Sequence, residues 1–268
     1  MWKSRSLILP FLFLAVGCGL SEYEKRMDQQ SLALKRFDEE NKVLSDPLNL
    51  PKLVDPKTSF VDVLVPVEFF LRAPKGTVIK ANNLEKAPPG TVPLFCYPGP
   101  PGFNVLVSTQ GIALEDKNPK PQEGKTRSKE FQPKVREALA RFYEKEFKKP
   151  IDWSRADKTE KRTVQVQSTK GQPLNLIFEY QTLTDDPDPQ KKNQPKDGLA
   201  KTKDNYHDFR LYFYQPGKEQ AAIIYQIPST KRNDRETNKG VDFSIRTLVL
   251  GVESGKKYQE FAKRRMKR

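Results

Sequence analysis

The segment DFRLYFYQ-PGKE-QAAIIYQI (208–227) predicts a β-hairpin, around which the rest of the chain can be arranged. Two runs of alternating side chains flank the turn PGK (216–218), and a short glycine-containing turn between such runs is typical of paired antiparallel strands. Side chains alternate between the two faces of a strand. One face of the first strand carries Phe209, Leu211 and Phe213. We therefore expect the hairpin to lie in an antiparallel sheet with a buried face.

The other face of the hairpin is also rich in apolar and aromatic side chains. It carries Arg210, Tyr212 and Tyr214 in the first strand, and the second strand is apolar on both faces. A sheet face of this composition is normally covered by a helix or by another sheet. A platform of exposed tyrosines for a ligand is the alternative.

Helices are predicted at three places in the same domain, and the first of them is of the amphipathic kind that usually packs on a sheet. At residues 129–148, apolar side chains recur three and four apart. They form a stripe of Phe131, Val135, Leu139 and Phe142. Ser128 can cap this helix, and Pro133 is tolerated because it falls near the first turn. A helix is also expected at 241–250, where a strand is the alternative, and a basic helix at 254–266.

Further strands complete the predicted architecture. They are expected at residues 60–71, 92–97, 103–108, 163–167 and 174–183. Antiparallel strands combined with separate helices indicate an α+β fold, in which an antiparallel sheet packs against helices. We expect one such domain at residues 58–268, connected by a Pro-rich linker at 46–57 to an amphipathic helix that precedes it.

The N-terminal sequence is typical of a bacterial lipoprotein signal. A short positive start precedes the apolar run LILPFLFLAV (7–16), which is too short to span a bilayer comfortably. The tetrapeptide AVGC (15–18) resembles a lipobox, in which the cysteine thiol is acylated and the cysteine becomes the first mature residue. An uncleaved anchor or an ordinary cleaved signal is the alternative.

The lipobox predicts where the mature protein resides. We expect a signal peptide at residues 1–17 and a lipid, such as palmitate, on Cys18, which would anchor the chain in a membrane and face it toward the periplasm. Gly19 follows the cysteine, so the acidic retention signal known in some bacteria is missing. The outer membrane is therefore favoured over the inner one.

The lipid-anchored segment at residues 18–45 is predicted to be an amphipathic helix. Ser21 and Glu24 have the spacing of a capping box. Heptad positions a and d fall on Leu20, Tyr23, Met27, Gln30, Leu34, Phe37, Asn41 and Leu44. This pattern favours self-association through residues 20–44 as a short coiled coil, with Asn41 fixing the register. A helix packed on its own domain is the alternative.

The charge of the chain favours an anionic partner. The full chain has 48 basic and 34 acidic residues, a net charge of +14, and removal of the signal would leave +12. The densest basic cluster comprises Lys263, Arg264, Arg265, Lys267 and Arg268. We expect these residues to bind anionic lipid headgroups or an envelope polymer, because export makes nucleic acid an unexpected partner. A solvated tail is the alternative.

Few side chains are suited to catalysis or metal binding. Acylation of Cys18 would leave Cys96 as a lone thiol in an apolar run, which predicts a buried, inert side chain. His207 is the single histidine, so a site built from several histidines is excluded, and we expect it at the surface or at a strand edge. The aspartates of 185–189 lack the glycine and glutamate of an EF-hand loop. Neither a metal nor another cofactor is expected.

Two families share features with these segments. Cys18 followed by SEYEKRM (21–27) and KRFDEEN (35–41) resembles the start of uncharacterised lipoproteins of planctomycete bacteria. From residue 60 onward, the order of elements is similar to the Mog1/PsbP-like fold, in which helices sandwich an antiparallel sheet. Members of that fold mostly bind partners without doing chemistry, so this resemblance implies a binding role.

These observations predict a non-enzymatic, lipid-anchored protein of the cell envelope that binds a protein or an anionic partner. The sequence contains neither a glycine-rich phosphate loop nor a nucleophile elbow. An envelope hydrolase that uses paired carboxylates is the alternative, because Asp and Glu are plentiful. A nucleic-acid-binding protein is supported by the net charge alone.

Overall fold

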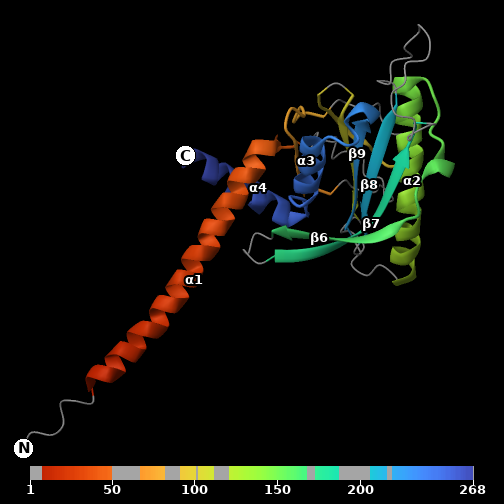
Figure 1. Cartoon of the computed structure of the whole chain (residues 1–268). Coiled ribbons are helices and arrows are strands. Elements are labelled where there is room, and N and C mark those ends of the chain that lie inside the picture. The colour runs from red at the N-terminus through yellow and green to blue at the C-terminus, as the bar shows by residue number, and fades with distance from the viewer. Residues whose placement is uncertain are drawn as a thin grey trace, which may run out of the picture. The chain divides into compact units, whose positions relative to one another are not determined.

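The computed structural model divides the chain into two units, Met1–Lys42 and Val43–Arg268 (Figure 1). It describes residues 8–49, 67–81, 91–100, 102–111, 121–167, 173–186, 206–215 and 219–267, with side chains from residue 20 onward except at 111, 121–129 and 167. In its described part, the first unit consists of the helix α1 (Ile8–Val43), whose last residue belongs to the second unit. The second unit combines helices with antiparallel sheets, which confirms the α+β fold preceded by an N-terminal helix.

A six-stranded antiparallel sheet forms the centre of the second unit, in the order β4-β5-β9-β8-β7-β6. Its strands are β4 (Phe95–Pro98), β5 (Asn104–Gly111), β6 (Glu160–Gln167), β7 (Pro173–Thr184), β8 (His207–Tyr214) and β9 (Glu219–Pro228). The predicted hairpin is confirmed as β8 and β9, which pair with Tyr212 opposite Ile223. It occupies the middle of the sheet, where both faces must be covered.

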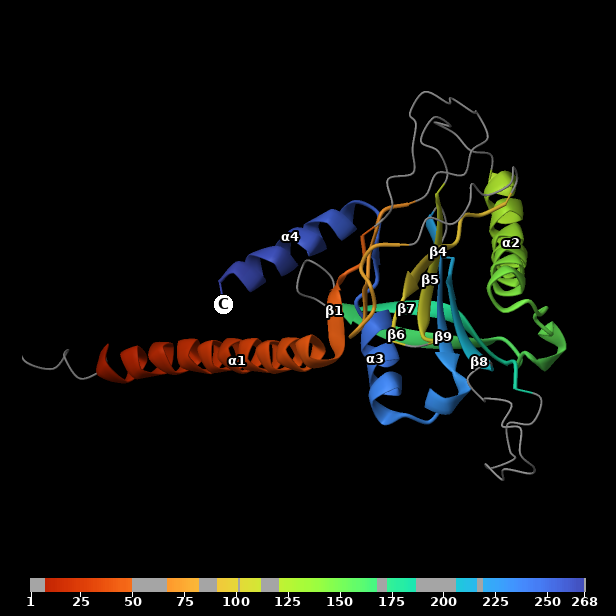
Figure 2. The ribbon, with the colours of Figure 1, turned by 90° about the horizontal axis from the view of Figure 1, so that it is seen from above.

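Both faces of this sheet are covered by helices. Figure 2 shows α2 (Pro121–Phe147) on one side and α3 (Arg235–Ile245) on the other. Under α2, the predicted stripe of Phe131, Val135, Leu139 and Phe142 is buried with Leu106, Phe209, Leu211 and Ile224. Under α3, Val241 and Ile245 are buried with Tyr212 and Tyr225. The tyrosine face of the hairpin is therefore mainly a packing surface, and Tyr212 is fully buried.

Helix α2 is longer at its N-terminus than predicted. It begins at Pro121, so Ser128 lies inside the helix and the expectation that it caps the N-terminus is wrong. Pro133 likewise lies in the helix interior, although it lacks the N–H of a normal helical hydrogen bond, a change that costs about 3 kcal/mol. It is exposed, while the stripe beside it is buried. Burial of the apolar stripe offsets that cost.

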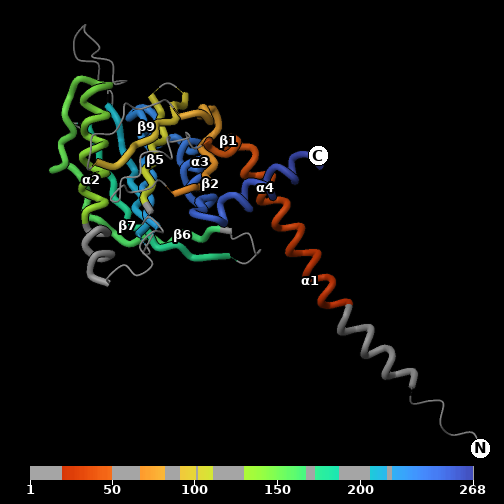
Figure 3. The backbone as a smooth tube through the Cα atoms, turned by 180° about the vertical axis from the view of Figure 1, so that it is seen from behind, coloured from red at the N-terminus to blue at the C-terminus, as the bar shows by residue number. Residues whose placement is uncertain are grey.

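Two short strand pairs lie near α3 and α4 (Val252–Met266), as seen from behind in Figure 3. β1 (Leu44–Pro47) pairs with β3 (Arg72–Pro74), and β10 (Val249–Leu250) pairs with β2 (Phe69–Phe70). Each of these strands is too short to be stable alone. They form only because distant segments of the chain provide their partner strands.

These pairs change three predicted boundaries. The N-terminal helix ends at Val43 and not at residue 45, since Leu44 begins β1 and is buried in the core. The first two residues of the expected linker at 46–57 belong to β1, and residues 50–57 lie outside the described part. The helix expected at 241–250 stops at Ile245, after which the chain turns into β10.

Candidate functional site

Helix α4 carries most of the predicted basic cluster, and an aromatic side chain docks it on the fold. Gly251 precedes the helix with φ of 71°, a left-handed conformation that glycine adopts without steric cost. Phe261 is buried, and its ring lies edge-on to that of Phe70, with 6.2 Å between the ring centroids. The guanidinium carbon of Arg72 lies 4.6 Å from the centroid of Phe261. These contacts hold one face of α4 against the fold.

Part of the surface of α4 presents several cations to the solvent. Lys256, Lys263, Arg264 and Lys267 are exposed, and their spacing places them on one side of the helix. Lys256 also lies 3.1 Å from the carboxylate of Glu253 one turn earlier. The surface formed by Lys263, Arg264 and Lys267, here called the α4 basic face, is the part of the predicted cluster best placed to meet a large anionic partner.

Arg265 is oriented differently from the rest of the predicted cluster. Its guanidinium forms an ion pair with Asp46 of β1 and lies 5.9 Å from the ring centroid of Phe261. Arg265 thus contributes to docking α4, because its charge is already matched by a carboxylate. The remaining member of the cluster, Arg268, lies outside the described residues.

A second basic surface lies on α2. A shallow hollow of about 450 Å³ is lined by Arg141, Glu144, Lys145 and Lys148. Its three cations follow helical spacing, as those of the α4 basic face do, but a carboxylate lies among them. This surface has a similar number of cations on a different helix, which makes it a useful comparison for the α4 basic face.

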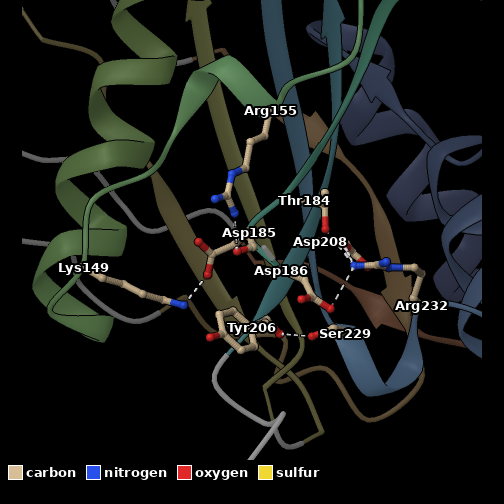
Figure 4. A network of polar contacts seen from close by, with 9 residues as sticks. All are labelled: Lys149, Arg155, Thr184, Asp185, Asp186, Tyr206, Asp208, Ser229 and Arg232. Atoms are coloured by element: carbon tan, nitrogen blue, oxygen red, sulfur yellow. Dashed lines mark hydrogen bonds and ion pairs between the residues drawn. The ribbon is translucent and has the colours of Figure 1, made fainter. Parts of the chain in front are cut away.

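A network of ion pairs connects the ends of β7 and β8 (Figure 4). Two nitrogens of Arg232 donate to the two carboxylate oxygens of Asp208, and Nη2 also donates to Thr184 Oγ1 at 2.7 Å. Asp186 lies 4.0 Å from the same guanidinium. The hydrogen bond to Asp208 raises the pKa of Arg232, so the arginine stays charged. This bidentate arrangement fixes the geometry of the strand ends.

The network continues toward α2 through Asp185. Its carboxylate accepts hydrogen bonds from Lys149 and from the hydroxyl of Tyr143, the latter at 2.6 Å. Its backbone carbonyl accepts a hydrogen bond of 3.2 Å from Arg155. In the described network each of the three aspartates has a cation nearby, an arrangement that stabilises strand ends. A carboxylate pair for hydrolysis would instead need an acid and a base that act on a shared substrate.

His207 is buried, so the expectation that it lies at the surface is wrong, and although it stands at the end of a strand, that strand is internal to the sheet. It begins β8 in the interior of the sheet, is 1% exposed, and packs against the ring of Phe147 with 4.5 Å between centroids. Its Nδ1 lies 3.3 Å from the Tyr143 hydroxyl, while no hydrogen-bond partner for Nε2 occurs among the described residues. Burial, and then the charge of Lys149, lower the pKa of His207 from 6.5 to about 4. The imidazole is therefore neutral at pH 7.

One cysteine lies in the central sheet and the other lies in the N-terminal helix. Cys96 lies in β4 and is buried, as predicted for an inert thiol. Burial, with a smaller contribution from the charge of Glu146, raises the pKa of Cys96 to about 12, so the reactive thiolate is scarce at neutral pH. Cys18 is one of the residues of α1. Its side chain is outside the part of the chain whose side chains are described.

Among the described residues, no three His, Cys, Asp or Glu side chains gather closely enough to hold a metal ion. Within the same part of the chain, no helix combines the length and the apolar character needed to cross a bilayer.

Comparison with known proteins places the chain in no family. No protein-family model matches it, and no curated protein matches it either. A crystal structure of a protein from Bacteroides thetaiotaomicron VPI-5482 is similar, with a TM-score of 0.30 and 12% sequence identity. The similarity covers 69% of this chain and 46% of that protein, so the chain corresponds to less than half of that protein's length.

Sequence reasoning found the basic end of the chain but missed how it is attached. The Arg265–Asp46 pair joins positions 219 residues apart, and nothing in the local sequence of either residue indicates it. The network around Asp185 and Arg232 was missed for the same reason. A partial signal existed, since acidic residues cluster just after the strand predicted at 174–183.

Proposed function

We propose that the protein is a lipid-anchored protein of the cell envelope that binds an anionic partner through the α4 basic face and performs no catalysis. The observation that carries this proposal is the arrangement of α4. Phe261 docks the helix on the fold, while Lys263, Arg264 and Lys267 at its C-terminal end are exposed to solvent. A firmly docked helix presents its charges as a fixed surface, so less conformational entropy is lost on binding.

The anchoring part of this proposal is supported by the N-terminal sequence. The lipobox AVGC (15–18) and the likeness of residues 18–41 to planctomycete lipoproteins both indicate acylation of Cys18. The absence of an acidic residue at position 19 favours the outer membrane, with the protein facing the periplasm. The native chain should fractionate with membranes and incorporate labelled palmitate, whereas Cys18→Ala should do neither. Equal distribution of the two chains would refute the anchor.

The absence of catalysis is supported by the positions of the groups that could perform it. The thiol of Cys96 and the imidazole of His207 are both buried. Asp185 and Asp208 form ion pairs with Lys149 and Arg232, which stabilises the strand ends. A general base must reach the proton that it removes from a substrate, and these groups are engaged within the fold.

An anionic surface is the partner that the α4 basic face fits best. Three cations on one turn and a half of helix can act together on lipid phosphates or on a polyanionic polymer of the envelope. Each cation near an anionic membrane surface contributes about 1 kcal/mol, and this attraction weakens as salt rises. Binding that is strong at low salt and weak at high salt is therefore expected.

A matched pair of triple variants tests this surface. The non-acylated Cys18→Ala chain is mixed with vesicles of phosphatidylglycerol and phosphatidylcholine, and separately with soluble polyphosphate. Lys263→Gln with Arg264→Gln and Lys267→Gln should weaken vesicle binding about a hundredfold. Arg141→Gln with Lys145→Gln and Lys148→Gln removes the same charge from α2 and should have a much smaller effect. Equal losses would mean that net charge, and not the α4 basic face, controls binding.

The two ligands separate the possible sources of the anion. Binding to vesicles with little binding to polyphosphate would identify a membrane surface as the target, because only the bilayer offers headgroups held in a plane. The reverse result would identify an envelope polymer. Binding that does not change between 50 mM and 500 mM salt would refute the electrostatic part of the proposal.

A further inference from the structure

Helix α1 exposes a row of large apolar side chains. Leu20, Tyr23, Met27 and Leu34 are 53, 61, 48 and 58% exposed. They occupy a and d positions of the heptad pattern, whose remaining members in the helix are Gln30, Phe37 and Asn41. These seven residues are here called the α1 seam. Leu44, the next position in the pattern, is buried in β1 and does not belong to it.

The spacing of the α1 seam indicates that its partner is another helix. Apolar side chains that repeat every 3.5 residues stay in contact with a helix that supercoils around them. The ion pairs on α1 lie beside this row: Arg26 pairs with Glu22 at 3.7 Å, and Arg36 pairs with Glu40 at 3.4 Å. Both pairs join c and g positions, so neither pair uses a side chain of the α1 seam.

We propose that α1 pairs in parallel and in register with α1 of a second copy of this chain. In that arrangement each seam residue faces its own counterpart, so Gln30 meets Gln30 and Asn41 meets Asn41. An antiparallel pair with the same seam would place Gln30 against Leu34 and Asn41 against Tyr23, which leaves polar groups facing apolar ones. The match of polar with polar layers selects the parallel arrangement.

The charges that flank the seam are compatible with this pairing. In a parallel pair, a g position faces the e position five residues later on the other helix. Arg26 therefore faces Ser31, and Ala33 faces Asp38. No like charges meet at these positions. An antiparallel pair would bring Glu24 toward Asp38 twice, although it would also bring Arg26 toward Glu40.

The parallel arrangement also agrees with anchoring, and to that extent it rests on the proposed function. Two chains held by Cys18 in the same membrane have their α1 helices starting at the same surface. The seam from residue 20 to residue 41 is only about 33 Å long at 1.5 Å per residue, which is short for a coiled coil. Confinement to a membrane raises the effective concentration of the second copy. The pair should therefore be favoured on the membrane.

Single added cysteines in the full chain in its native membrane test the pairing. Met27→Cys lies in the seam, and Leu32→Cys is its control, because Leu32 is also apolar and exposed but lies at the outward f position. A mild added oxidant should convert Met27→Cys to a disulfide-linked dimer, since disulfides form only where Cα atoms approach within about 7 Å. Leu32→Cys should yield no more disulfide-linked dimer than the unsubstituted chain does. Equal cross-linking of both variants, or none with Met27→Cys, would overturn the proposal.

Two additional arms test the interface and its direction. Leu34→Asp, added to Met27→Cys, should abolish the cross-link by placing a charge in the seam. Chains of two sizes, one with Tyr23→Cys and one with Asn41→Cys, are also co-expressed. A parallel pair yields like-with-like dimers, whereas a 23–41 dimer of mixed size would refute the parallel direction.

Fractionation of the same samples distinguishes a failure of the proposed pairing from a failure of the proposed anchor. If the chain is found in membranes and Met27→Cys fails to cross-link, the pairing is wrong while the anchor stands. If the chain is soluble, the anchor is wrong, and the oxidation is repeated on the purified chain at high concentration. Met27→Cys must then still cross-link more than Leu32→Cys, or the pairing is wrong as well.

Discussion

The guanidinium of Arg265 on α4 forms an ion pair with the carboxylate of Asp46 on β1. This contact joins the last helix of the chain to a strand near the start of the same unit. It also distinguishes Arg265 from Lys263. Both side chains are exposed, but the charge of Arg265 is matched by a carboxylate within the fold. Two basic residues only two positions apart should therefore have different effects when they are changed.

Replacement of Arg265 and of Lys263 should distinguish docking from binding. Arg265→Gln should lower the free energy of unfolding by about 0.5 kcal/mol, because the pair is partly exposed, and should leave vesicle binding within about twofold. Lys263→Gln should leave stability unchanged and weaken vesicle binding about fivefold. Urea unfolding and vesicle sedimentation measure the two effects. If Arg265→Gln weakened vesicle binding by more than about twofold, Arg265 would contribute to binding and would not be held by Asp46.

Leu139 should be a main contributor to the core under α2. It is fully buried in the apolar stripe, so Leu139→Ala should lower the free energy of unfolding by about 2–5 kcal/mol. Glu144→Ala, an exposed change on the same helix, should alter it by less than about 0.5 kcal/mol. Chemical unfolding of both variants measures this difference. A near-zero effect of Leu139→Ala would mean that α2 does not pack as described.

The buried imidazole of His207 should make the fold sensitive to acid. Its pKa is lowered to about 4 in the fold from 6.5 in the unfolded chain, so the unfolded chain binds the proton more readily between these values. The stabilising effect of a neutral His207 is fully present above pH 6.5 and is lost as pH falls toward 4. The loss amounts to at most about 3 kcal/mol.

Comparison with His207→Gln isolates this contribution from that of the carboxylates. The free energy of unfolding of each chain is measured at several pH values between 4 and 7. The advantage of the native chain over the variant should shrink as the pH falls, because the variant has no imidazole to protonate. Parallel stability curves for the two chains would contradict a lowered pKa for His207.

The thiol of Cys96 should be unreactive in the folded protein. Its pKa is raised to about 12 and its side chain is buried, so both the thiolate and access to it are limited. In the Cys18→Ala chain, where Cys96 is the only thiol, a disulfide reagent at pH 8 should react slowly in buffer and fully in guanidinium. Rapid reaction of the folded chain would show that β4 opens or that the thiol is accessible.

Local patterns were sufficient to predict the central elements of this fold. The alternation at 208–227 predicted the β8–β9 hairpin, and the stripe containing Leu139 predicted the buried side of α2. Both depend on periodicities of 2 and about 3.6 residues, which reveal which side chains must be buried together. The N-terminal helix was predicted by the same reasoning, although its end was placed two residues too late.

The missed features depend on partners that are distant in the sequence. Leu44 continues the heptad pattern, yet it lies in a strand because β3 provides hydrogen bonds and the core provides burial. His207 follows a polar segment, yet it is buried because Tyr143 and Phe147 of α2 pack against it. In both cases a tertiary contact outweighs the local preference.

The candidate site likewise combines features that local sequence predicts with features that depend on distant partners. The sequence alone established that the C-terminus is basic and that residues 15–18 resemble a lipobox, since both are local properties of composition and order. Only the tertiary structure decided that Arg265 pairs with Asp46 while Lys263 and Lys267 remain exposed. The physical reason is that the role of a charge depends on which groups surround it, and folding brings those groups from more than two hundred residues away.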